Sequence, residues 1–255
     1  MDESTENMSV TSGIGKAGWR LFECGSAAST NDLAKSLPVW SAVRADQQSG
    51  GRGRFGRAFV SDPGGLWISA ILPAPGGPAR WAGFSLMVGH HLVRMLQGLN
   101  LASARLRWPN DLMAGKKKLG GLLIEQSARE ALVVGFGLNV SNSPWNSDPS
   151  LEAIATSLSS LSNPAPAVDE MAVHTLDALT DAHEAMESGG MPSAIEQLNP
   201  GWSAPRAVEI TLSHGEKVGG RFVGLDPAGN LRLLNDRDCE FLVGHQSIEK
   251  LTELQ

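Results

Sequence analysis

Residues 50–59 read G-G-R-G-R-F-G-R-A-F, and the segments on either side of this loop restrict the possible folds. Residues 39–45 and 66–72 are short apolar runs bounded by turn residues, a pattern typical of β-strands. A dinucleotide-binding fold would instead need a helix to begin at the glycines and an acidic residue about 20 positions later, and neither is present. A P-loop would need Lys and Ser or Thr where this chain has Arg57 and Ala58. The sequence therefore predicts two strands joined by a loop. We call this loop, residues 50–59, the arginine loop.

The arginine loop concentrates positive charge in a chain whose formal net charge is −6. Glycine lets the backbone approach an anion closely, and the guanidinium groups of Arg52, Arg54 and Arg57 suit a phosphate or a carboxylate. Such a loop is expected to close over an anionic ligand. The alternative from the residues alone is a solvated basic turn. RNA binding is less favoured because only Phe55 and Phe59 supply aromatic rings and there is no repeated tract.

The overall composition is that of an ordinary soluble protein. The chain has 255 residues, of which 42% are hydrophobic and 19% are charged, enough for one large domain or a medium domain with a small one. The acidic balance argues against bulk nucleic-acid binding, and no apolar run has the length of a membrane span. Cys24 and Cys239 form no disulfide framework or zinc motif, which favours a cytoplasmic location. Residues 1–18 lack the apolar region of a signal peptide and are expected to form a flexible polar tail.

The remaining pattern predicts an α/β domain followed by a small β domain. We expect a catalytic or binding domain over residues 19–203 and a C-terminal domain of short strands over residues 204–255. A short helix is expected to begin near Ser29 or Thr30. The further strands expected in the first domain cover residues 104–108, 119–125 and 131–140. The further helices expected there cover residues 81–99, 151–161, 169–186 and 192–198.

A second stretch with candidate functional residues is R-L-R-W-P-N-D-L-M-A-G-K-K-K-L-G-G-L-L-I-E, residues 105–125. Its proline ends a strand, so Asn110 and Asp111 are expected at a turn, where short polar side chains are favoured. Lys118 directly precedes a predicted strand, which can fix its orientation, and the glycine pair that ends at Gly121 lets a ligand lie against bare backbone. The alternatives are a solvated lysine-rich turn and a simple ion pair between Asp111 and Lys118.

A third stretch, G-F-G-L-N, ends at Asn139. Glycines weaken a strand unless another group packs closely against them. Asn139 can read the edge of a base or a ribose, and a plain packing role for the two glycines is equally compatible with the pattern.

Five motifs in a fixed order resemble those of the biotin–protein ligases, also called biotin–[acetyl-CoA-carboxylase] ligases. They are S-T-N at 29–31, Q-x-x-G-R-G-R-x-G-R at 48–57, W-P-N-D at 108–111, K-L-G-G-L-L-I-E at 118–125 and G-x-G-L-N-V at 135–140. The resemblance covers about residues 20 to 145. It implies a mixed sheet with helices, like the class II aminoacyl-tRNA synthetase core, and an SH3-like barrel over the C-terminal domain.

The resemblance also implies a reaction in two steps. The carboxylate of biotin attacks the α-phosphate of ATP in the presence of Mg²⁺, which gives biotinyl-5′-AMP and pyrophosphate. A lysine of a biotin carboxyl carrier domain then takes the biotinyl group and AMP leaves. The expected partners are this carrier domain and the small molecules biotin and ATP, with no nucleic acid and no membrane.

By the same resemblance, site residues can be assigned to each ligand. The expected biotin-binding residues are Ser29, Thr30, Asn31, Gln48, Arg52, Gly53, Arg54, Lys118 and Gly121. The expected nucleotide-binding residues are Arg52, Arg54, Arg57, Asn110, Lys118 and Asn139. The expected catalytic residues are Arg52, Arg54, Lys118 and Asp111. Asp111 would orient or deprotonate the acceptor lysine or help to hold Mg²⁺, and no other metal ligand is assigned.

The sequence departs from the family pattern at two aromatic positions of the arginine loop. Phe55 stands where many relatives carry a basic residue, and Phe59 where tryptophan is common. Only 28 residues precede Ser29, fewer than the roughly 60 of a winged helix-turn-helix, so no operator binding is expected. The rivals are a lipoate-protein ligase or related acyltransferase of the same fold, and a non-catalytic nucleic-acid-binding module.

Overall fold

The computed structural model describes residues 8–127, 130–162, 164, 166–202, 205–244 and 247–254. The chain divides into two compact units, residues 1–183 and residues 184–255. The predicted domain boundary between residues 203 and 204 lies outside the described residues. Across the described part of the chain, no helix is both long enough and apolar enough to cross a membrane.

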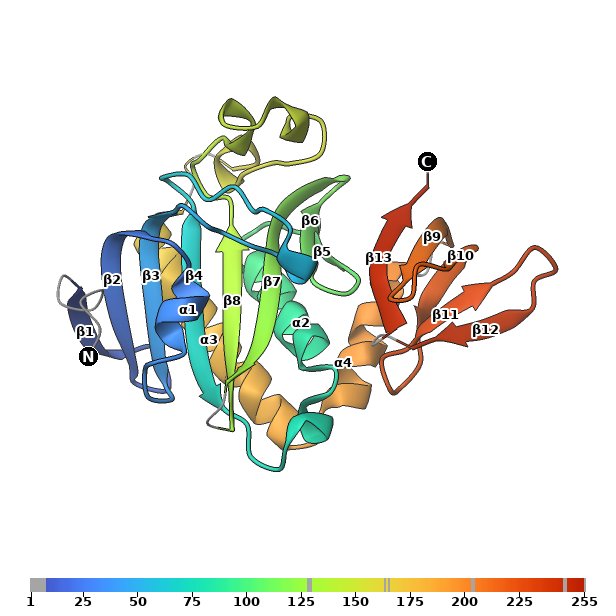
Figure 1. The fold of residues 1–255 in the computed structure, drawn as a ribbon, viewed down its shortest axis with the longest axis horizontal. Helices are drawn as coiled ribbons and strands as arrows, with labels where there is room; N and C mark the ends of the chain where they lie inside the picture. The colour runs from blue at the N-terminus through green and yellow to red at the C-terminus, as the bar shows by residue number, and fades with distance from the viewer. Residues whose placement is uncertain are drawn as a thin grey trace. The chain divides into compact units, whose positions relative to one another are not determined.

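The first unit is built on an eight-stranded mixed sheet (Figure 1). Its order across the sheet is β1-β2-β3-β4-β8-β7-β6-β5, and β2 pairs with β3 in parallel while the other neighbours are antiparallel. The strands are β1 (Ser9–Ile14), β2 (Trp19–Ala27), β3 (Ser41–Gln48), β4 (Leu66–Pro73), β5 (Ala104–Arg107), β6 (Asp111–Ala114), β7 (Lys117–Ser127) and β8 (Ala131–Leu138).

Helices cover both faces of this sheet. In the view of Figure 1, α1 (Thr30–Ala34) lies in front of the central strands, and α2 (Phe84–Gly98) and α3 (Val168–Glu187) lie behind the sheet. Because both faces are covered, the middle strands read as nearly continuous apolar runs, and β4 is buried from Leu66 to Leu72. A polar side chain inside such a strand needs a partner, a requirement that becomes important at Ser69.

The N-terminal residues differ from the prediction of a flexible tail over residues 1–18. Residues 1–7 lie outside the described part of the chain, but Ser9–Ile14 forms β1 and pairs with β2. As an edge strand, β1 exposes nearly all of its side chains, so its polar sequence S-V-T-S-G-I lacks the alternation of a half-buried strand. The expectation of a loose segment is therefore wrong for these six residues.

The helix predicted over residues 151–161 is also wrong. Two short 3₁₀ turns, Pro149–Leu151 and Leu158–Ser160, lie near its ends. Between them a turn leads to an isolated parallel bridge between Ala155 and Lys118: the Lys118 amide donates to the Ile154 carbonyl at 2.7 Å, and the Thr156 amide donates to the Lys118 carbonyl at 2.9 Å. An amide or carbonyl already used in this way cannot also bond along a helix.

The second unit contains α4 (Met191–Leu198) and a five-stranded antiparallel sheet. Its order is β12-β11-β10-β9-β13. The strands are β9 (Arg206–Leu212), β10 (Lys217–Leu225), β11 (Leu231–Leu234), β12 (Glu240–Val243) and β13 (Ile248–Glu253). The predicted α/β class with a large mixed sheet is confirmed, and the closure of the C-terminal strands into an SH3-like barrel stays a prediction.

Candidate active site

A pocket in the first unit is bordered by α1, by the central strands of the sheet and by the arginine loop. It draws residues from motifs that are far apart in the sequence. Its lining consists of Ser29, Thr30, Asn31, Gln48, Arg52, Gly53, Phe59, Ile68, Ser69, Asn110, Lys118, Gly121, Leu122, Leu123, Gly135, Phe136 and Gly137. Polar groups thus lie beside apolar side chains, the usual make-up of a site for a small organic ligand.

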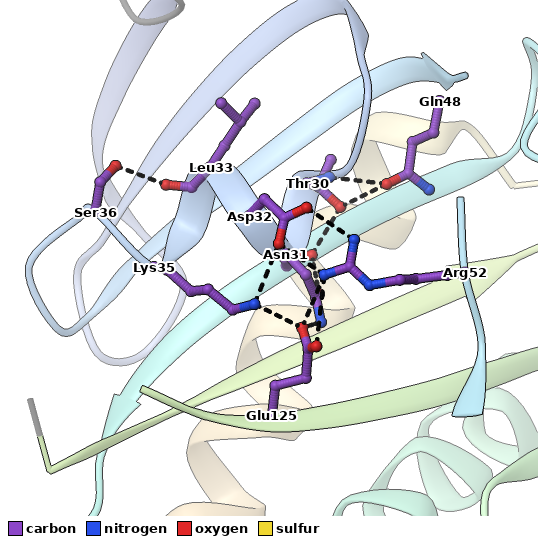
Figure 2. Close-up of polar contacts among 10 residues, drawn as sticks. Thr30, Asn31, Asp32, Leu33, Lys35, Ser36, Gln48, Arg52 and Glu125 are labelled. Carbon is purple, nitrogen blue, oxygen red and sulfur yellow. Dashed lines mark hydrogen bonds and ion pairs between the residues drawn. The ribbon is translucent and has the colours of Figure 1, made fainter. Parts of the chain in front are cut away.

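A row of hydrogen-bonded side chains forms the polar part of the pocket wall (Figure 2). Gln48 Oε1 accepts from the Thr30 amide at 2.8 Å and from Thr30 Oγ1 at 3.0 Å. Thr30 Oγ1 also lies 2.7 Å from Ser69 Oγ, and Ser69 Oγ donates to Asn31 Oδ1 at 2.6 Å. Asn31 Nδ2 then donates to Glu125 Oε2 at 2.8 Å. The pocket therefore offers fixed donors and acceptors to an uncharged polar ligand group.

Two glycines of β8 make room for this arrangement. A Cβ atom at Gly135 would overlap Asn31 Oδ1, and a Cβ atom at Gly137 would lie 2.7 Å from the ring of Phe59. The sequence motif G-x-G thus has a packing reason, since one glycine admits the Asn31 amide and the other admits an aromatic ring from the arginine loop.

Four charged residues meet at one side of the pocket, and we call them the Arg52 cluster: Asp32, Lys35, Arg52 and Glu125 (Figure 2). Arg52 grips Asp32 with two hydrogen bonds, Nη1 to Oδ2 at 2.8 Å and Nη2 to Oδ1 at 2.6 Å. Arg52 Nη2 also lies 3.3 Å from Glu125 Oε2. Lys35 Nζ lies 3.1 Å from Asp32 Oδ1 and 3.2 Å from Glu125 Oε2. Two cations and two carboxylates therefore balance each other.

The contacts of the Arg52 cluster shift its titrations toward the charged forms. The hydrogen bond from Arg52 lowers the pKa of Asp32 to about 2, and the same bond raises the pKa of Arg52. Partial burial alone would raise the pKa of Glu125, but hydrogen bonds from Asn31 and Lys35 and the charge of Arg52 outweigh it and lower that pKa. Asp32, Arg52 and Glu125 are therefore ionised near neutral pH.

A second charged group lies on the neighbouring strands, and we call it the Lys118 cluster: Arg107, Asp111 and Lys118. Asp111 Oδ2 accepts from Arg107 Nη2 at 2.6 Å, and Asp111 Oδ1 lies 2.6 Å from Lys118 Nζ. Burial alone would raise the pKa of Asp111. The charges and hydrogen bonds of Lys118 and Arg107 lower this pKa by more than burial raises it, so the net shift is downward. Lys118 Nζ also lies 5.4 Å from the centre of the Phe59 ring, which orients it further.

The other two arginines of the loop flank Phe55. The Cζ atoms of Arg54 and Arg57 lie 5.0 Å and 5.8 Å from the centre of its ring. Burial lowers the pKa of Arg54, and the nearby charge of Arg57 acts in the same direction. The loop therefore holds two guanidinium groups close together, an arrangement that an anion would stabilise.

Comparisons with known proteins agree with this geometry. Residues 26–139 match the model of the Biotin/lipoate A/B protein ligase family. A biotin–[acetyl-CoA-carboxylase] ligase of Mycobacterium tuberculosis is 30% identical over 231 residues, which are 85% of this chain and 84% of that protein. The chain belongs to the biotin–protein ligase family.

Two further members of the biotin–protein ligase family differ in how much of their length the match covers. The bifunctional ligase/repressor BirA of Bacillus subtilis is 35% identical over 138 residues, but the match spans only 42% of that protein. The solved biotin protein ligase of Aquifex aeolicus, in complex with biotin and ATP, superposes with a TM-score of 0.79 at 25% identity. That superposition covers 92% of this chain and 99% of the Aquifex chain. Because these relatives are named as biotin ligases, the lipoate alternative is not favoured.

The structure brings most of the predicted ligase residues to one pocket. Those that line it are Ser29, Thr30, Asn31, Gln48, Arg52, Gly53, Asn110, Lys118 and Gly121. Those that do not line it are Arg54, Arg57, Asp111 and Asn139. Asp111 nevertheless contacts Lys118 directly, and Arg54 and Arg57 belong to the arginine loop that borders the pocket. The roles assigned to all of these residues stay predictions.

Two of the predicted nucleotide-binding residues use their side chains within the fold. Asn139 Nδ2 donates to the Thr156 carbonyl at 3.0 Å, and Asn139 Oδ1 accepts from Asn142 at 2.9 Å. Asn110 Nδ2 donates to the Leu122 carbonyl at 2.7 Å. Their amides therefore hold the strand ends in place, and a nucleotide would have to compete with these bonds.

Sequence reasoning missed Asp32, Lys35, Ser69 and Glu125. Ser69 had a usable signal, because a serine inside the apolar strand L-W-I-S-A-I-L must find a polar partner when it is buried. Glu125 stood at the end of the motif K-L-G-G-L-L-I-E, but its contact with Arg52 joins residues 73 positions apart. Asp32 and Lys35 had no signal beyond their place beside S-T-N.

The residues around the pocket do not fit a magnesium site of the protein's own. Mg²⁺ prefers several oxygen ligands in octahedral geometry. Both oxygens of Asp111 already face cations, and the described residues contain no group of three or more His, Cys, Asp or Glu side chains that could hold a metal. The metal-ligand role of Asp111 therefore stays a prediction, and its two ion pairs argue against it.

Proposed function

We propose that the protein is an ATP-dependent biotin–[acetyl-CoA-carboxylase] ligase. Biotin and ATP would bind in the pocket described above and react to biotinyl-5′-AMP. The biotinyl group would then pass to one lysine of a biotin carboxyl carrier domain. The observation that carries this proposal is the junction, in one pocket, of an uncharged polar wall with the cation Lys118 and with the arginine loop.

The first step joins two anions and therefore needs positive charge around the reacting atoms. The bond between a carboxylate oxygen of biotin and the α-phosphorus of ATP forms while the bond to the leaving pyrophosphate breaks. Lys118 is fixed by Asp111 and Phe59 at the pocket wall, where it can offset the charge of both reactants. Arg54 and Arg57 would supply further charge when the arginine loop closes.

The uncharged end of biotin suits the opposite part of the pocket. Its ureido ring carries two N–H donors and one carbonyl acceptor. The row of Gln48, Thr30, Ser69 and Asn31 offers complementary groups that are already held in place. Such a wall selects by hydrogen bonds rather than by charge, so it would discriminate against a ligand that lacks those groups.

In the second step the amine of the acceptor lysine attacks the acyl carbon of the mixed anhydride. A C–N bond forms, the bond to the phosphate oxygen breaks and AMP leaves, while the amine gives up one proton to solvent water. Asp111 lies beside Lys118 and can orient the incoming ammonium or amine by its charge. Its lowered pKa makes it a weak base, which favours orientation over proton removal.

We also infer a cytoplasmic location, supported by the use of ATP and by the two free cysteines among the described residues. The proposed acceptor, a carrier domain of a biotin-dependent carboxylase, would be found in the same compartment.

The test is incubation of the purified protein with biotin, MgATP and a biotin carboxyl carrier domain. We expect pyrophosphate release and a carrier whose mass increases by one biotinyl group. A parallel incubation with lipoate is expected to give neither. Modification of the carrier by lipoate, with no modification by biotin, would overturn the proposal.

A further inference from the structure

The polar row of the pocket wall ends on a carboxylate. The polar row consists of Gln48, Thr30, Ser69 and Asn31, which are joined in that order by hydrogen bonds. Beyond the row, Glu125 Oε2 accepts from Asn31 Nδ2 at 2.8 Å (Figure 2). The four members of the row line the pocket, whereas Glu125 does not belong to the lining. Glu125 can thus influence the row through Asn31 without a contact to the ligand.

Glu125 determines which way the Asn31 amide faces. Because its carboxylate is ionised, Glu125 accepts hydrogen bonds and has none to donate. Asn31 must therefore turn its NH₂ group toward Glu125, which leaves Asn31 Oδ1 on the opposite side. Ser69 Oγ donates to this oxygen at 2.6 Å. The hydroxyl proton of Ser69 is thereby committed to Asn31.

The opposite end of the polar row is fixed independently. Ser61 Oγ donates to the Phe59 carbonyl at 3.1 Å, so it must accept from Gln48 Nε2, which lies 3.0 Å away. The Thr30 backbone amide donates to Gln48 Oε1 at 2.8 Å. Both contacts turn the amide oxygen of Gln48 toward Thr30, where this oxygen can accept a hydrogen bond but cannot donate one.

The polar row therefore contains one donor fewer than it needs. Its four oxygen atoms, Asn31 Oδ1, Ser69 Oγ, Thr30 Oγ1 and Gln48 Oε1, form three successive contacts of 2.6, 2.7 and 3.0 Å. Ser69 and Thr30 carry the only hydroxyl protons of the row, so two protons serve three contacts. The Ser69 proton goes to Asn31, and the single Thr30 proton goes either to Ser69 or to Gln48. One oxygen–oxygen contact lacks a proton at any time.

This shortage makes the polar row a receptor for N–H groups. Thr30 Oγ1 and Gln48 Oε1 have no proton left for a ligand, so they meet it with lone pairs. A ligand N–H that reaches these two oxygens supplies the missing donor. A ligand oxygen at the same place would add a further acceptor without a partner, which is costly at a buried residue such as Thr30.

We propose that Glu125 is a positioning residue that keeps the polar row one proton short and thereby selects ligands with N–H donors. It acts through Asn31 and Ser69 and not on the reacting atoms. The identity of the ligand rests on the proposed function, in which the ureido ring of biotin brings the N–H groups. The number of donors in the row, in contrast, is a property of the ligand-free chain.

The variant Glu125→Gln is expected to supply the missing donor from within the protein. Arg52 Nη2 and Lys35 Nζ lie 3.3 and 3.2 Å from Glu125 Oε2, so these cations take the one carbonyl oxygen of the new amide. Its NH₂ group is left facing Asn31, whose own amide turns over and presents its oxygen. Asn31 Nδ2 then points into the polar row, and each of the three contacts holds a proton.

The first test compares biotin with the two cyclic carbamates in which one ring N–H of biotin is replaced by oxygen. Isothermal titration of the wild-type protein should favour biotin over at least one carbamate by about 100-fold or more, because a buried polar group would be left unpaired. Glu125→Gln should weaken biotin binding by about 5- to 30-fold and reduce that preference to below about tenfold. A variant that merely distorts the pocket would weaken all three ligands alike, so an unchanged preference would overturn the proposal.

The matched control is Asp32→Asn, which removes the same charge beside the same cations. The ion pairs and hydrogen bonds of Asp32 go to Arg52 and Lys35 and not to Asn31. This variant should keep both its biotin affinity and its preference over the carbamates within about threefold of wild type. A loss of preference as large as in Glu125→Gln would assign the effect to the charge around Arg52 and contradict a role of the polar row.

A second measurement needs no ligand. Urea unfolding is compared for Glu125→Gln, Ser69→Ala and the double variant. Without the Ser69 hydroxyl, the turned Asn31 amide has no acceptor. Glu125→Gln should therefore raise the unfolding constant about three- to tenfold more in the Ser69→Ala background than in the wild-type background. Asp32→Asn should combine additively with Ser69→Ala, and additivity for Glu125→Gln as well would count against the proposal.

The two measurements separate this proposal from the proposed function. If the wild-type protein binds no biotin while the unfolding constants of Glu125→Gln and Ser69→Ala are non-additive, the ligase function fails and the donor shortage stands. If biotin binds and is ligated, but the preference over the carbamates is the same in wild type and Glu125→Gln, the donor shortage fails and the ligase function stands.

Discussion

Two charged groups border the same pocket, and they are built differently. The Lys118 cluster is carried by β5, β6 and β7, paired strands of the sheet, and holds two cations against one carboxylate. The Arg52 cluster combines α1, β7 and the arginine loop, and holds two cations against two carboxylates. The side chain of Asp111 is 20% exposed, whereas that of Asp32 is 53% exposed.

The difference indicates two separate tasks for positive charge. A rigid cluster with an excess cation can offer fixed charge to a carboxylate and a phosphate. A balanced cluster attracts an anion less, but it can hold a loop in place and release it at small cost because its members are partly exposed. Fixed charge would then come from the strands, and access to the pocket would be controlled by the loop.

The largest effect is expected at the rigid cluster. Lys118→Ala should slow formation of biotinyl-5′-AMP by about 100-fold or more, as is usual when a fixed electrostatic group is removed from a reaction site. The assay is biotin-dependent pyrophosphate release. The control is Lys116→Ala, which removes an exposed lysine two positions away. Equal rates for the two variants would show that the strands do not supply the fixed charge.

Stability should distinguish the two carboxylates. Asp111→Asn leaves Arg107 and Lys118 facing each other without a counter-charge and should lower the free energy of unfolding by about 2 kcal/mol, somewhat less than for a fully buried pair. Asp32→Asn should lower it by less than about 1 kcal/mol. Urea unfolding of both variants measures the difference. Equal losses would contradict the assignment of one rigid and one easily released cluster.

Two glycine substitutions test the steric support of each cluster. Gly135→Ala places a methyl group on the buried Asn31 amide, which supports Glu125, and should weaken biotin binding by about 5- to 30-fold, as overpacking of about 1–2 kcal/mol implies. Gly121→Ala would bring its Cβ to 3.3 Å from Lys118 Cε and Nζ, a tight contact that a shift of a few tenths of an ångström relieves, so a change below about threefold is expected. Isothermal titration with biotin compares them, and a larger effect for Gly121→Ala would reverse our ranking.

The smallest effect concerns pH. The pKa of Asp32 is lowered to about 2 by Arg52, whereas a free aspartate titrates near about 3.9. A lowered pKa in the folded state means that the ion pair contributes fully above about pH 4 and is lost as the pH falls through about 2. The difference in unfolding free energy between wild type and Asp32→Asn should therefore stay constant from about pH 7 to 4. A difference that already shrinks between pH 6 and 5 would show that Arg52 does not hold Asp32.

The sequence predicted the parts of the site that lie in local motifs. S-T-N, the arginine loop, W-P-N-D and K-L-G-G each contributed residues to one pocket, because each motif sits where a strand of the sheet begins or ends. The covered strands β4 and β8 were also predictable, since burial on both faces gives a continuous apolar run. Local pattern was sufficient wherever a single segment determined the environment.

The sequence failed where the environment depends on distant partners. Strand β1 has polar, exposed side chains and is defined only by its pairing with β2, and the four-residue strand β6 was not predicted, since Asp111 was expected at a turn. The Arg52 cluster joins α1, the arginine loop and β7, and ion pairs between distant segments leave no periodic trace. The predicted helix at 151–161 failed for the same reason, since its backbone bonds go to another strand.

The backbone bonds between residues 154–156 and β7 also bear on the position of Lys118. The backbone amide and carbonyl of Lys118 are hydrogen-bonded to residues 154 and 156, so the segment after β8 helps to fix the backbone from which the ammonium group extends. An insertion or deletion in residues 141–153 would shift this hydrogen-bonded backbone and alter how far the Lys118 side chain reaches toward an anionic ligand. Relatives that differ in length at this stretch could thus tune the reaction while keeping every charged residue unchanged.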